Sequence, residues 1–357
     1  MKYEVLQADP ADGDKLLELI ESQAAKGDLE ILYTRRPNPV ISYQNESKST
    51  SIGVIKDETG TPCFMEVCIV RDYYLHEQKA TLMYACGVRK KTGCGNNFSW
   101  LRDAYQYETK DKTAGFCSIL DANLTALDVF GRKPRKFFPT LAKLCEYTTF
   151  LINPRAVKRC PRNRFTFRRV EESDLPQVYH FLENEGKKYE MYPVVCDLEN
   201  QFSGLLLKDC YILTKEGEIA AFGALWNQRH YRQFIVKHYG GIYRYLRKAA
   251  GITEKLGYIY LPPEGQTAQV LTLTLMTCKD GDAGTYSVLL SNLAKQAIQA
   301  GCPILAAGMS KNNHYYQAYR KLRSIRFDST IFTVDVQGNQ LPLPDAAREI
   351  HIECGYL

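Results

Sequence analysis

The spacing of apolar residues predicts a short strand over residues 3–7, an acidic turn, and a helix that begins near residue 16. Two apolar runs at residues 51–55 and 63–70 flank the polar stretch 57–60, which is typical of a β-hairpin. The first part of the chain is therefore expected to mix strands and helices.

The second part of the chain repeats this order of elements. A strand over residues 165–170 is followed by acidic residues, Pro176 and a helical pattern, and the runs 211–213 and 219–225 predict another hairpin. A late element also recurs, because an Asn precedes an aromatic residue by seven positions both from Asn123 and from Asn312. Such self-similarity indicates a duplicated unit.

This repeat predicts two domains, over residues 1–152 and 165–357. The stretch 153–164 between them is rich in cations and proline and is interpreted as a linker. The second copy is longer because it carries an insert at about residues 226–263.

Composition narrows the class of protein. Apolar residues make up 45% of the 357 positions and charged residues 24%, the profile of a globular protein. No apolar run is long enough for a transmembrane helix and the N-terminus lacks a signal-peptide core, so a cytoplasmic protein without a membrane partner is expected. The 12 cysteines occur singly, which favours reduced thiols over zinc ligands or disulfides, and no metal site is predicted.

The most informative stretch lies at residues 80–105. An apolar strand over residues 80–88 runs into Arg89, Lys90 and Lys91, then into glycines 93 and 95, and a helical pattern follows. Amide groups at a helix N-terminus beside cations can bind a phosphate, so a pyrophosphate-bearing cofactor is the functional interpretation. An ordinary basic turn is the alternative.

The order of these elements resembles the GCN5-related N-acetyltransferase (GNAT) superfamily, in tandem. The family's loop pattern Arg/Gln-x-x-Gly-x-Gly/Ala is matched by residues 90–95 with Lys90 in the first position, and Asn-x-x-Ala-x-x-x-Tyr is matched by Asn123, Ala126 and Phe130 with the tyrosine replaced. The resemblance implies an α+β fold of two tandem GNAT-like domains, each a mixed, mostly antiparallel twisted sheet flanked by helices.

The same resemblance implies an N-acetyltransferase that uses acetyl-CoA and transfers the acetyl group to an amine of a small molecule or peptide. In this family the pantetheine arm lies between two splayed strands, and the turn after the first of them holds the pyrophosphate. Variable loops make the acceptor pocket, here residues 35–51 and 226–263. The cofactor-binding residues implied are Cys86, Val88, Lys90, Lys91, Thr92, Gly93, Cys94, Gly95, Asn96 and Asn123.

The two copies differ in chemistry. At the corresponding turn of the second copy, Asp280 and Asp282 would repel a pyrophosphate, so the first copy is expected to hold the cofactor. The family's general acid is matched in the second copy by Tyr319 but in the first by Phe130, which cannot donate a proton. Tyr319 is thus a catalytic candidate, with an ordinary buried tyrosine as the alternative.

A general base is sought near the hairpin of the first copy. Glu66 is the candidate, because burial would raise its pKa toward the range in which a carboxylate can take a proton from an ammonium group. A glutamate that faces solvent is the favoured alternative. Asp72, His76 and Glu77 are the other options.

Two other functions are compatible with a tandem of this kind. One is an aminoacyl-tRNA-dependent transferase, for which the cations and aromatic residues of the insert would contact RNA; nucleic acid is otherwise not expected. The other is a non-catalytic CoA-binding sensor.

Overall fold

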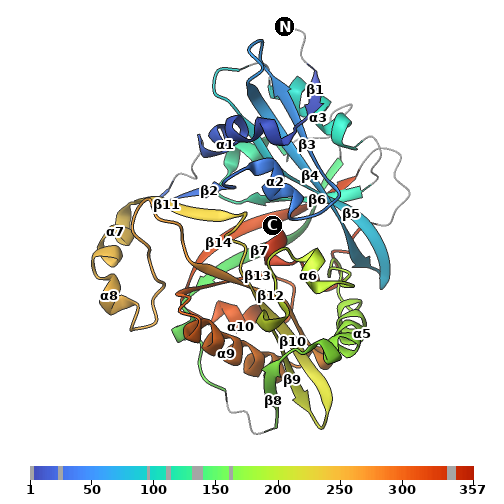
Figure 1. The fold of residues 1–357 in the computed structure, drawn as a ribbon, viewed down its shortest axis with the longest axis vertical. Helices are drawn as coiled ribbons and strands as arrows, with labels where there is room; N and C mark the ends of the chain where they lie inside the picture. The colour runs from blue at the N-terminus through green and yellow to red at the C-terminus, as the bar shows by residue number, and fades with distance from the viewer. Residues whose placement is uncertain are drawn as a thin grey trace.

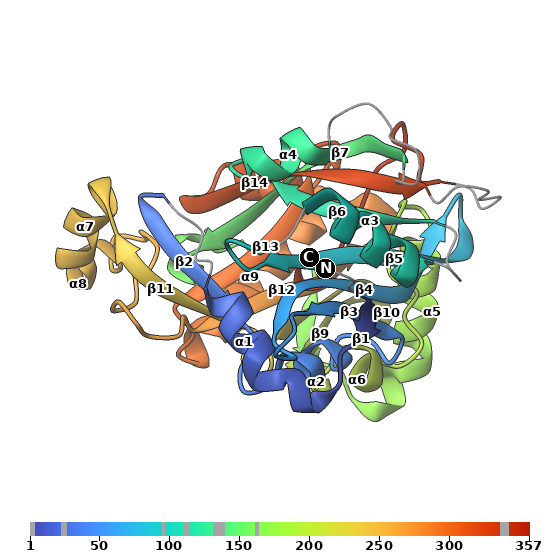
Figure 2. The ribbon, with the colours of Figure 1, turned by 90° about the horizontal axis from the view of Figure 1, so that it is seen from above.

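The computed structural model describes residues 4–22, 27–94, 97–109, 114–130, 140–160, 164–335 and 343–357. A 12-stranded sheet runs through the whole molecule, and helices cover both of its faces (Figure 1). Seen from above, the sheet is strongly twisted (Figure 2). We call residues 1–152 and 165–357 the first and second halves.

The first half contains β1 (Val5–Gln7), η1 (Pro10–Asp12), α1 (Gly13–Glu21), β2 (Leu29–Thr34), α2 (Pro39–Gln44), β3 (Thr50–Lys56), β4 (Pro62–Leu75), β5 (Gln78–Lys90), α3 (Asn97–Thr109), β6 (Ala114–Leu120), α4 (Leu124–Phe130) and β7 (Thr140–Ile152). Helices α1 and α3 cover opposite faces of its sheet. On β4, Phe64 packs with Trp100 of α3, whereas the next residue, Met65, packs in the main core with Leu16 of α1. This alternation is the period of two that a strand imposes on its side chains.

The connection between the halves contains η2 (Pro154–Ala156), and the second half contains β8 (Thr166–Arg169), η3 (Glu172–Asp174), α5 (Leu175–Gly186), α6 (Leu198–Gln201), η4 (Leu207–Asp209), β9 (Cys210–Lys215), β10 (Glu218–Trp226), β11 (Gln233–Tyr239), α7 (Gly241–Lys248), α8 (Ala250–Thr253), β12 (Val270–Cys278), η5 (Lys279–Gly281), α9 (Ala283–Gln299), β13 (Ile304–Ser310), α10 (Tyr316–Arg320), β14 (Ser324–Asp335) and η6 (Cys354–Tyr356). Helices α5 and α9 pack on its strands β10 and β12. The predicted mixed sheet flanked by helices is confirmed.

The two halves share their sheet by exchanging strands. The strand order is β1-β3-β4-β5-β6-β14-β7-β13-β12-β10-β9-β8, so β14 of the second half lies between β6 and β7 of the first, and β7 pairs with β13. Among the described strands of this sheet, only β5–β6 and β12–β13 are parallel neighbours. A separate two-stranded sheet of β2 and β11 joins the halves again.

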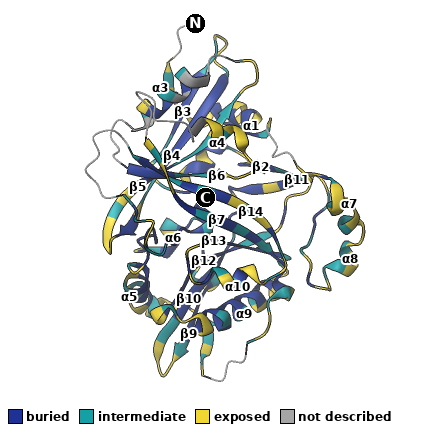
Figure 3. Cartoon of the chain, turned by 180° about the vertical axis from the view of Figure 1, so that it is seen from behind, coloured by how far each residue is buried: buried dark blue, intermediate teal, exposed yellow. Residues whose placement is uncertain are grey.

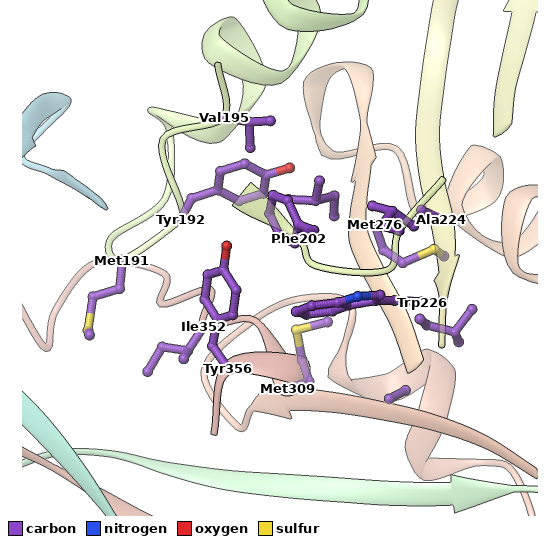
Figure 4. Packing of buried hydrophobic residues seen from close by; sticks show 14 of the residues in the cluster. Met191, Tyr192, Val195, Phe202, Ala224, Trp226, Met276, Met309, Ile352 and Tyr356 are labelled. Atoms are coloured by element: carbon purple, nitrogen blue, oxygen red, sulfur yellow. The ribbon is translucent and has the colours of Figure 1, made fainter. Parts of the chain in front are cut away.

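The segment 343–357 returns to the middle of the molecule, and its residues from Ile350 onward are buried or half-buried (Figure 3). Tyr356 stacks on Phe202 with ring centroids 5.3 Å apart and meets Trp226 edge-on at 6.0 Å (Figure 4). The hydroxyl group of Tyr147 on β7 donates a hydrogen bond to the carbonyl oxygen of Ile352 at 3.0 Å. This segment therefore belongs to the core shared by both halves.

All 12 cysteines are free thiols. Within the described residues, no helix is long and apolar enough to cross a membrane.

Candidate active site

Strands β5 and β6 pair over only two positions before they separate. The paired residues are Met83 with Gly115 and Tyr84 with Phe116, and no further pairing joins these two described strands. We call this divergence the first split. A parallel pair that separates exposes backbone groups of both strands to whatever lies between them.

A β-bulge lies on β5 just beyond the point of separation. Met65 of β4 pairs with Arg89 and Val67 pairs with Cys86, so Glu66 alone faces both Gly87 and Val88. Gly87 has φ +64°, a left-handed conformation that glycine adopts without strain. The bulge therefore changes the direction of β5 where it leaves β6.

The predicted order of strand, basic turn and helix is confirmed at the end of β5. The strand ends at Lys90 and α3 begins at Asn97, while the amide of Lys91 donates to the carbonyl oxygen of Cys63 at 2.8 Å. Gly93 is exposed and has φ +83°, and among the described residues no atom lies within 4 Å of a Cβ placed on it. The described part of the turn thus leaves space beside a backbone that suits glycine.

The other predicted cofactor residues of this region differ in exposure. Lys91 and Thr92 are exposed, whereas Lys90 and Cys94 are half-buried. The Lys90 ammonium lies 5.9 Å from the centroid of the Trp100 ring on α3, and Cys94 packs against the cluster around that ring. Gly95 and Asn96 lie outside the described residues.

Two of the predicted residues lie on β5 beside the first split, and a third, Asn123, follows β6. Cys86 is half-buried, and burial raises the pKa of its thiol to about 12, so it is protonated at neutral pH. Val88 is 36% exposed. Asn123 is exposed and its Oδ1 accepts a hydrogen bond from the amide of Ala126 at 3.1 Å, which caps α4.

Glu66 is buried, with 5% of its surface exposed, so the solvent-facing alternative is wrong. Its neighbour Val67 shares a face with the paired Cys86, which places Glu66 on the other face of the sheet, the one that α3 covers. The charge of Glu66 also raises the pKa of Cys117 on β6, although burial is the larger cause. Glu66 therefore lies beside the first split, directly opposite the bulge.

Tyr319 lies in the second half and is 1% exposed. Its hydroxyl group forms a hydrogen bond of 2.5 Å with that of Tyr286 on α9, and its ring stacks on Phe150 at 5.7 Å. Burial raises the pKa of Tyr319. Among the described residues, these contacts join Tyr319 to α9 and β7.

The second half has an equivalent split between β12 and β13, which pair only from Val270 with Ile304 to Thr272 with Ala306. Here too a bulge follows, because Phe222 of β10 pairs with Thr277 and Ala224 pairs with Thr274. The first bulged residue is Leu275, with φ +53°, the position that Gly87 holds in β5. We call this divergence the second split.

The chain itself fills the second split. Glu353 accepts hydrogen bonds from the amide of Leu275 at 2.8 Å and from the hydroxyl group of Thr274 at 2.6 Å. On the other side, a Cβ placed on Gly308 of β13 would lie 2.8 Å from the Cβ of Cys354. Residues 353–354 therefore occupy the space between β12 and β13.

The N-terminus of α9 in the second half is also occupied. Asp282 caps the helix, because its Oδ1 accepts from the amide of Gly284 at 2.7 Å and its Oδ2 accepts from the hydroxyl group of Thr285 at 2.9 Å. A carboxylate already satisfies donors that a phosphate would need and adds a repelling charge.

Sequence reasoning did not connect three arginines near the first split, Arg35, Arg71 and Arg232, whose side chains are buried around Glu46; of these it considered only Arg232, as a possible RNA contact of the insert. Arg35 and Glu46 lie in the segment 35–51 and Arg232 in the segment 226–263, the two segments predicted to make the acceptor pocket. The structure brings these segments together, because the hydroxyl group of Ser42 donates to the carbonyl oxygen of Tyr231. An arginine beside tyrosines in both segments was the available signal.

The insert of the second half contains β11, α7 and α8. Tyr231, Arg232 and Tyr239 are buried, whereas Arg244 and Tyr245 are exposed on α7. Part of the basic and aromatic set that the tRNA alternative invokes is therefore in the interior.

No protein-family profile and no curated protein matches the sequence. Among solved structures, the chain is similar to Saccharomyces cerevisiae N-myristoyltransferase with bound myristoyl-CoA, at 10% identity and a TM-score of 0.59 over 99% of this chain and 84% of that one. It is also similar to an Enterococcus faecalis protein of unknown function described as a probable N-acyltransferase, at 7% identity and a TM-score of 0.52 over 94% and 73%.

A third similar structure is a GCN5-related glucosamine N-acetyltransferase region of a fungal multi-domain β-N-acetylglucosaminidase. Its identity is 10% and its TM-score 0.60, over 93% of this chain and 38% of that one. The match to N-myristoyltransferase covers 99% of this chain and so includes both halves. The chain therefore has the fold of the GCN5-related N-acyltransferases, with two such halves in tandem.

Proposed function

We propose that this protein is an acyl-CoA-dependent N-acyltransferase that transfers an acetyl group from acetyl-CoA to an amine of a small molecule or peptide. One observation carries the proposal: of two equivalent splits in one sheet, the second is filled by Glu353 and the first ends in a basic glycine turn. The similar structures include N-acyltransferases, one of them with myristoyl-CoA bound, which supports acyl transfer and leaves acyl length to experiment.

The turn after β5 suits the diphosphate of CoA. Lys91 is exposed there, and Gly93 adopts a conformation that favours glycine, with no described atom within 4 Å of a Cβ placed on it. In the second half the corresponding position carries Asp282, so the charges of the two turns are opposite. Cations attract the diphosphate and a carboxylate repels it.

The bulge of β5 is proposed to stabilise the reacting carbonyl group. In acyl transfer the amine nitrogen gives a proton to a base and bonds to the thioester carbon, so the carbonyl oxygen becomes negative. The carbonyl group then re-forms as the carbon–sulfur bond breaks and CoA leaves as the thiolate. The equivalent bulge amide, that of Leu275, already donates to a negative oxygen of Glu353 at 2.8 Å. The amide of Gly87 is therefore the proposed oxyanion donor.

Glu66 is the proposed general base, because it is buried directly opposite Gly87 and Val88. A carboxylate at that point is close to the carbonyl that the bulge would hold. An exchange of Glu66 for Gln is expected to lower turnover more than acyl-CoA affinity.

The cofactor site is tested at Gly93. The variants Gly93→Glu and Gly93→Gln impose the same backbone strain and nearly the same volume, so they differ only in charge. A carboxylate about 5 Å from a diphosphate opposes binding by roughly 3 kcal/mol per unit charge at an effective dielectric constant near 20. We expect calorimetry to show weaker acetyl-CoA binding for Gly93→Glu than for Gly93→Gln, with both variants folded.

Equal affinities of the two variants would contradict the assignment of the turn. Turnover over a panel of amines then separates the remaining alternatives. Acetyl-CoA binding without any product would favour a non-catalytic sensor. Salt-sensitive binding of tRNA would favour an aminoacyl-tRNA-dependent transferase.

A further inference from the structure

Three arginines and one glutamate are buried together beside the first split; we call them the arginine cluster. Arg35 follows β2, Glu46 follows α2, Arg71 lies on β4 and Arg232 precedes β11. Arg35 is 3% exposed, Glu46 4% and Arg232 8%, and the side chain of Arg71 is 8% exposed. The cluster thus joins four separate segments from both halves.

Glu46 holds two of the arginines. Its Oε1 accepts from Nη2 of Arg35 at 2.5 Å, and its Oε2 accepts from Nη2 of Arg71 at 2.9 Å. Although burial raises the pKa of Glu46, the nearby charges of Arg35, Arg232 and Arg71 outweigh it and lower the pKa to about 2. Glu46 is therefore ionised, and its negative charge is already shared between Arg35 and Arg71.

The charges of the cluster do not balance. The cluster has three guanidinium groups and one carboxylate, so by itself it carries two excess positive charges. Within the described residues Arg232 forms no ion pair, and neither the buried Glu353 nor the terminal carboxylate of Leu357 pairs with an arginine of the cluster. Its Nη1 donates instead to the carbonyl oxygen of Gly355 at 2.7 Å. A buried charge without a counter-charge is unfavourable, so an excess of this kind calls for an anion.

Hydrogen-bond donors in the cluster are also unsatisfied. Nε of Arg35, Nη1 of Arg71 and Nε of Arg232 are buried and have no hydrogen-bond partner in the described part of the chain. Tyrosine rings cover the guanidinium groups, at 3.6 Å for Tyr43 over Arg35 and 3.9 Å for Tyr356 over Arg71. A ring face attracts a cation but does not replace an oxygen acceptor in the plane of the guanidinium.

The cluster lies next to the bulge of β5. The Tyr43 ring under Arg35 brings its hydroxyl oxygen to 2.7 Å from a Cβ placed on Gly87. Arg35 and Arg71 also act electrostatically on the thiol of Cys86, the residue before Gly87. The excess positive charge is therefore on the same face of β5 as Cys86, opposite the face that holds Glu66.

We propose that the arginine cluster binds an oxyanion group of the acceptor, so that the substrate is an amine that also carries a carboxylate or a phosphate. The identification of the bound molecule as the acceptor rests on the proposed function, whereas the binding of an anion by the cluster does not. Arg71 and Arg232 receive the oxyanion, and Glu46 together with Arg35 keeps Arg71 oriented. The amine is thereby directed toward the bulge from the face that holds Cys86, and its proton reaches Glu66 on the other face through the gap between β5 and β6.

A structural role is the competing explanation, since the same groups tie β2, β4, β11 and the segment 343–357 together. The two explanations differ in what they predict for ligands. A structural cluster treats an acidic amine and its neutral analogue alike. An anion site distinguishes them by the factor of ten or more that hydrogen bonds to a charged group provide.

The experiment compares matched amines on the full chain. Amino acids are set against their carboxamides, and phosphoethanolamine against ethanolamine, with acylated product measured by mass spectrometry and binding by calorimetry. We expect the acidic member of a pair to bind or react at least about tenfold better. A preference for amino acids over their carboxamides identifies a carboxylate as the oxyanion, and a preference for phosphoethanolamine over ethanolamine identifies a phosphate. Equal behaviour within both sets overturns the proposal.

The variant Arg232→Gln tests the residue, and Arg244→Gln is its control on exposed α7. Arg232→Gln should raise KM for the acidic amine about tenfold more than KM for its neutral analogue, whereas Arg244→Gln should raise neither. A change that affects acidic and neutral amines equally overturns the proposal in favour of the structural role.

The proposed function and the anion site fail separately. If acetyl-CoA neither binds nor reacts but calorimetry still distinguishes acidic from neutral amines, the acyltransferase assignment is lost and the anion site stands. If acetyl-CoA binds and neutral amines react as well as acidic ones, the acyltransferase stands and the anion site is lost.

Discussion

The substitution Glu46→Gln tests how the arginine cluster is held together. It keeps the shape of the side chain but removes its charge, and it places an amide donor where Glu46 accepts from Arg35 or Arg71. Three buried guanidinium groups would then have no carboxylate partner among the described residues. We therefore expect the variant to be destabilised well beyond the usual effect of a surface change.

The size of the effect follows from the pKa of Glu46. Its ordinary value of 4.5 falls to about 2 in the folded protein, and at about 1.36 kcal/mol per pH unit the difference corresponds to roughly 3 kcal/mol. Loss of one partner of a buried ion pair costs about 3–5 kcal/mol in other proteins, which agrees. Against a typical free energy of unfolding of about 5–15 kcal/mol, this is a large share.

The sign of the pH dependence follows as well. Because the folded-state pKa is below the unfolded one, the stabilisation is complete above pH 4.5 and is lost as pH falls toward about 2. Urea denaturation followed by tryptophan fluorescence should therefore show the wild type losing its advantage over Glu46→Gln in that range.

Glu146→Gln provides a matched control on β7. The pKa of Glu146 is also lowered to about 2, chiefly by hydrogen bonds from Lys143 and Lys311, but its side chain is 44% exposed. We expect it to have little effect on stability, because exposed ion pairs are screened by water. If Glu46→Gln is as stable as Glu146→Gln at neutral pH, the reasoning about the cluster is refuted.

Two further predictions concern the halves. Each half has one tryptophan, Trp100 or Trp226, so each of the variants Trp100→Phe and Trp226→Phe reports fluorescence from one half alone. Because the exchanged strands should make the halves unfold together, we expect the fluorescence transition in urea to coincide with the circular dichroism transition in both variants. Separate transitions in either variant would contradict this. Tyr319→Phe should leave turnover nearly unchanged. Its free energy of unfolding should fall by about 1–3 kcal/mol, because the hydroxyl group of Tyr286 loses its buried partner. A hundredfold loss of turnover would instead place the reaction in the second half.

Local pattern was enough to predict the elements around the first split. The apolar run ending near residue 88, the cations and the glycines are contiguous, so strand, turn and helix follow from neighbouring residues. The burial of Glu66 was not predictable in this way. Alternation separates the two faces of a strand but does not say that α3 covers the face on which Glu66 lies.

Long-range pairing was beyond the sequence pattern. Nothing near β14 indicates that it lies between β6 and β7, because such pairing is a property of two distant segments. The arginine cluster has the same origin, since Arg35, Arg71 and Arg232 are far apart along the chain. Their individual environments suggest exposed cations, and only the fold makes them neighbours.

The duplication lets one half serve as a reference for the other. In both bulges a single residue faces two, and the first of these has a left-handed conformation, with φ +64° at Gly87 and +53° at Leu275. The second half pairs its bulge amide with the carboxylate of Glu353 and caps its helix with Asp282, so its own acidic side chains occupy both positions where a ligand's negative groups would bind. The first half, with basic residues at its turn and an excess of buried arginine near its bulge, is complementary to negative groups supplied from outside. An acyl-CoA with an acidic acceptor amine fits that arrangement of charge.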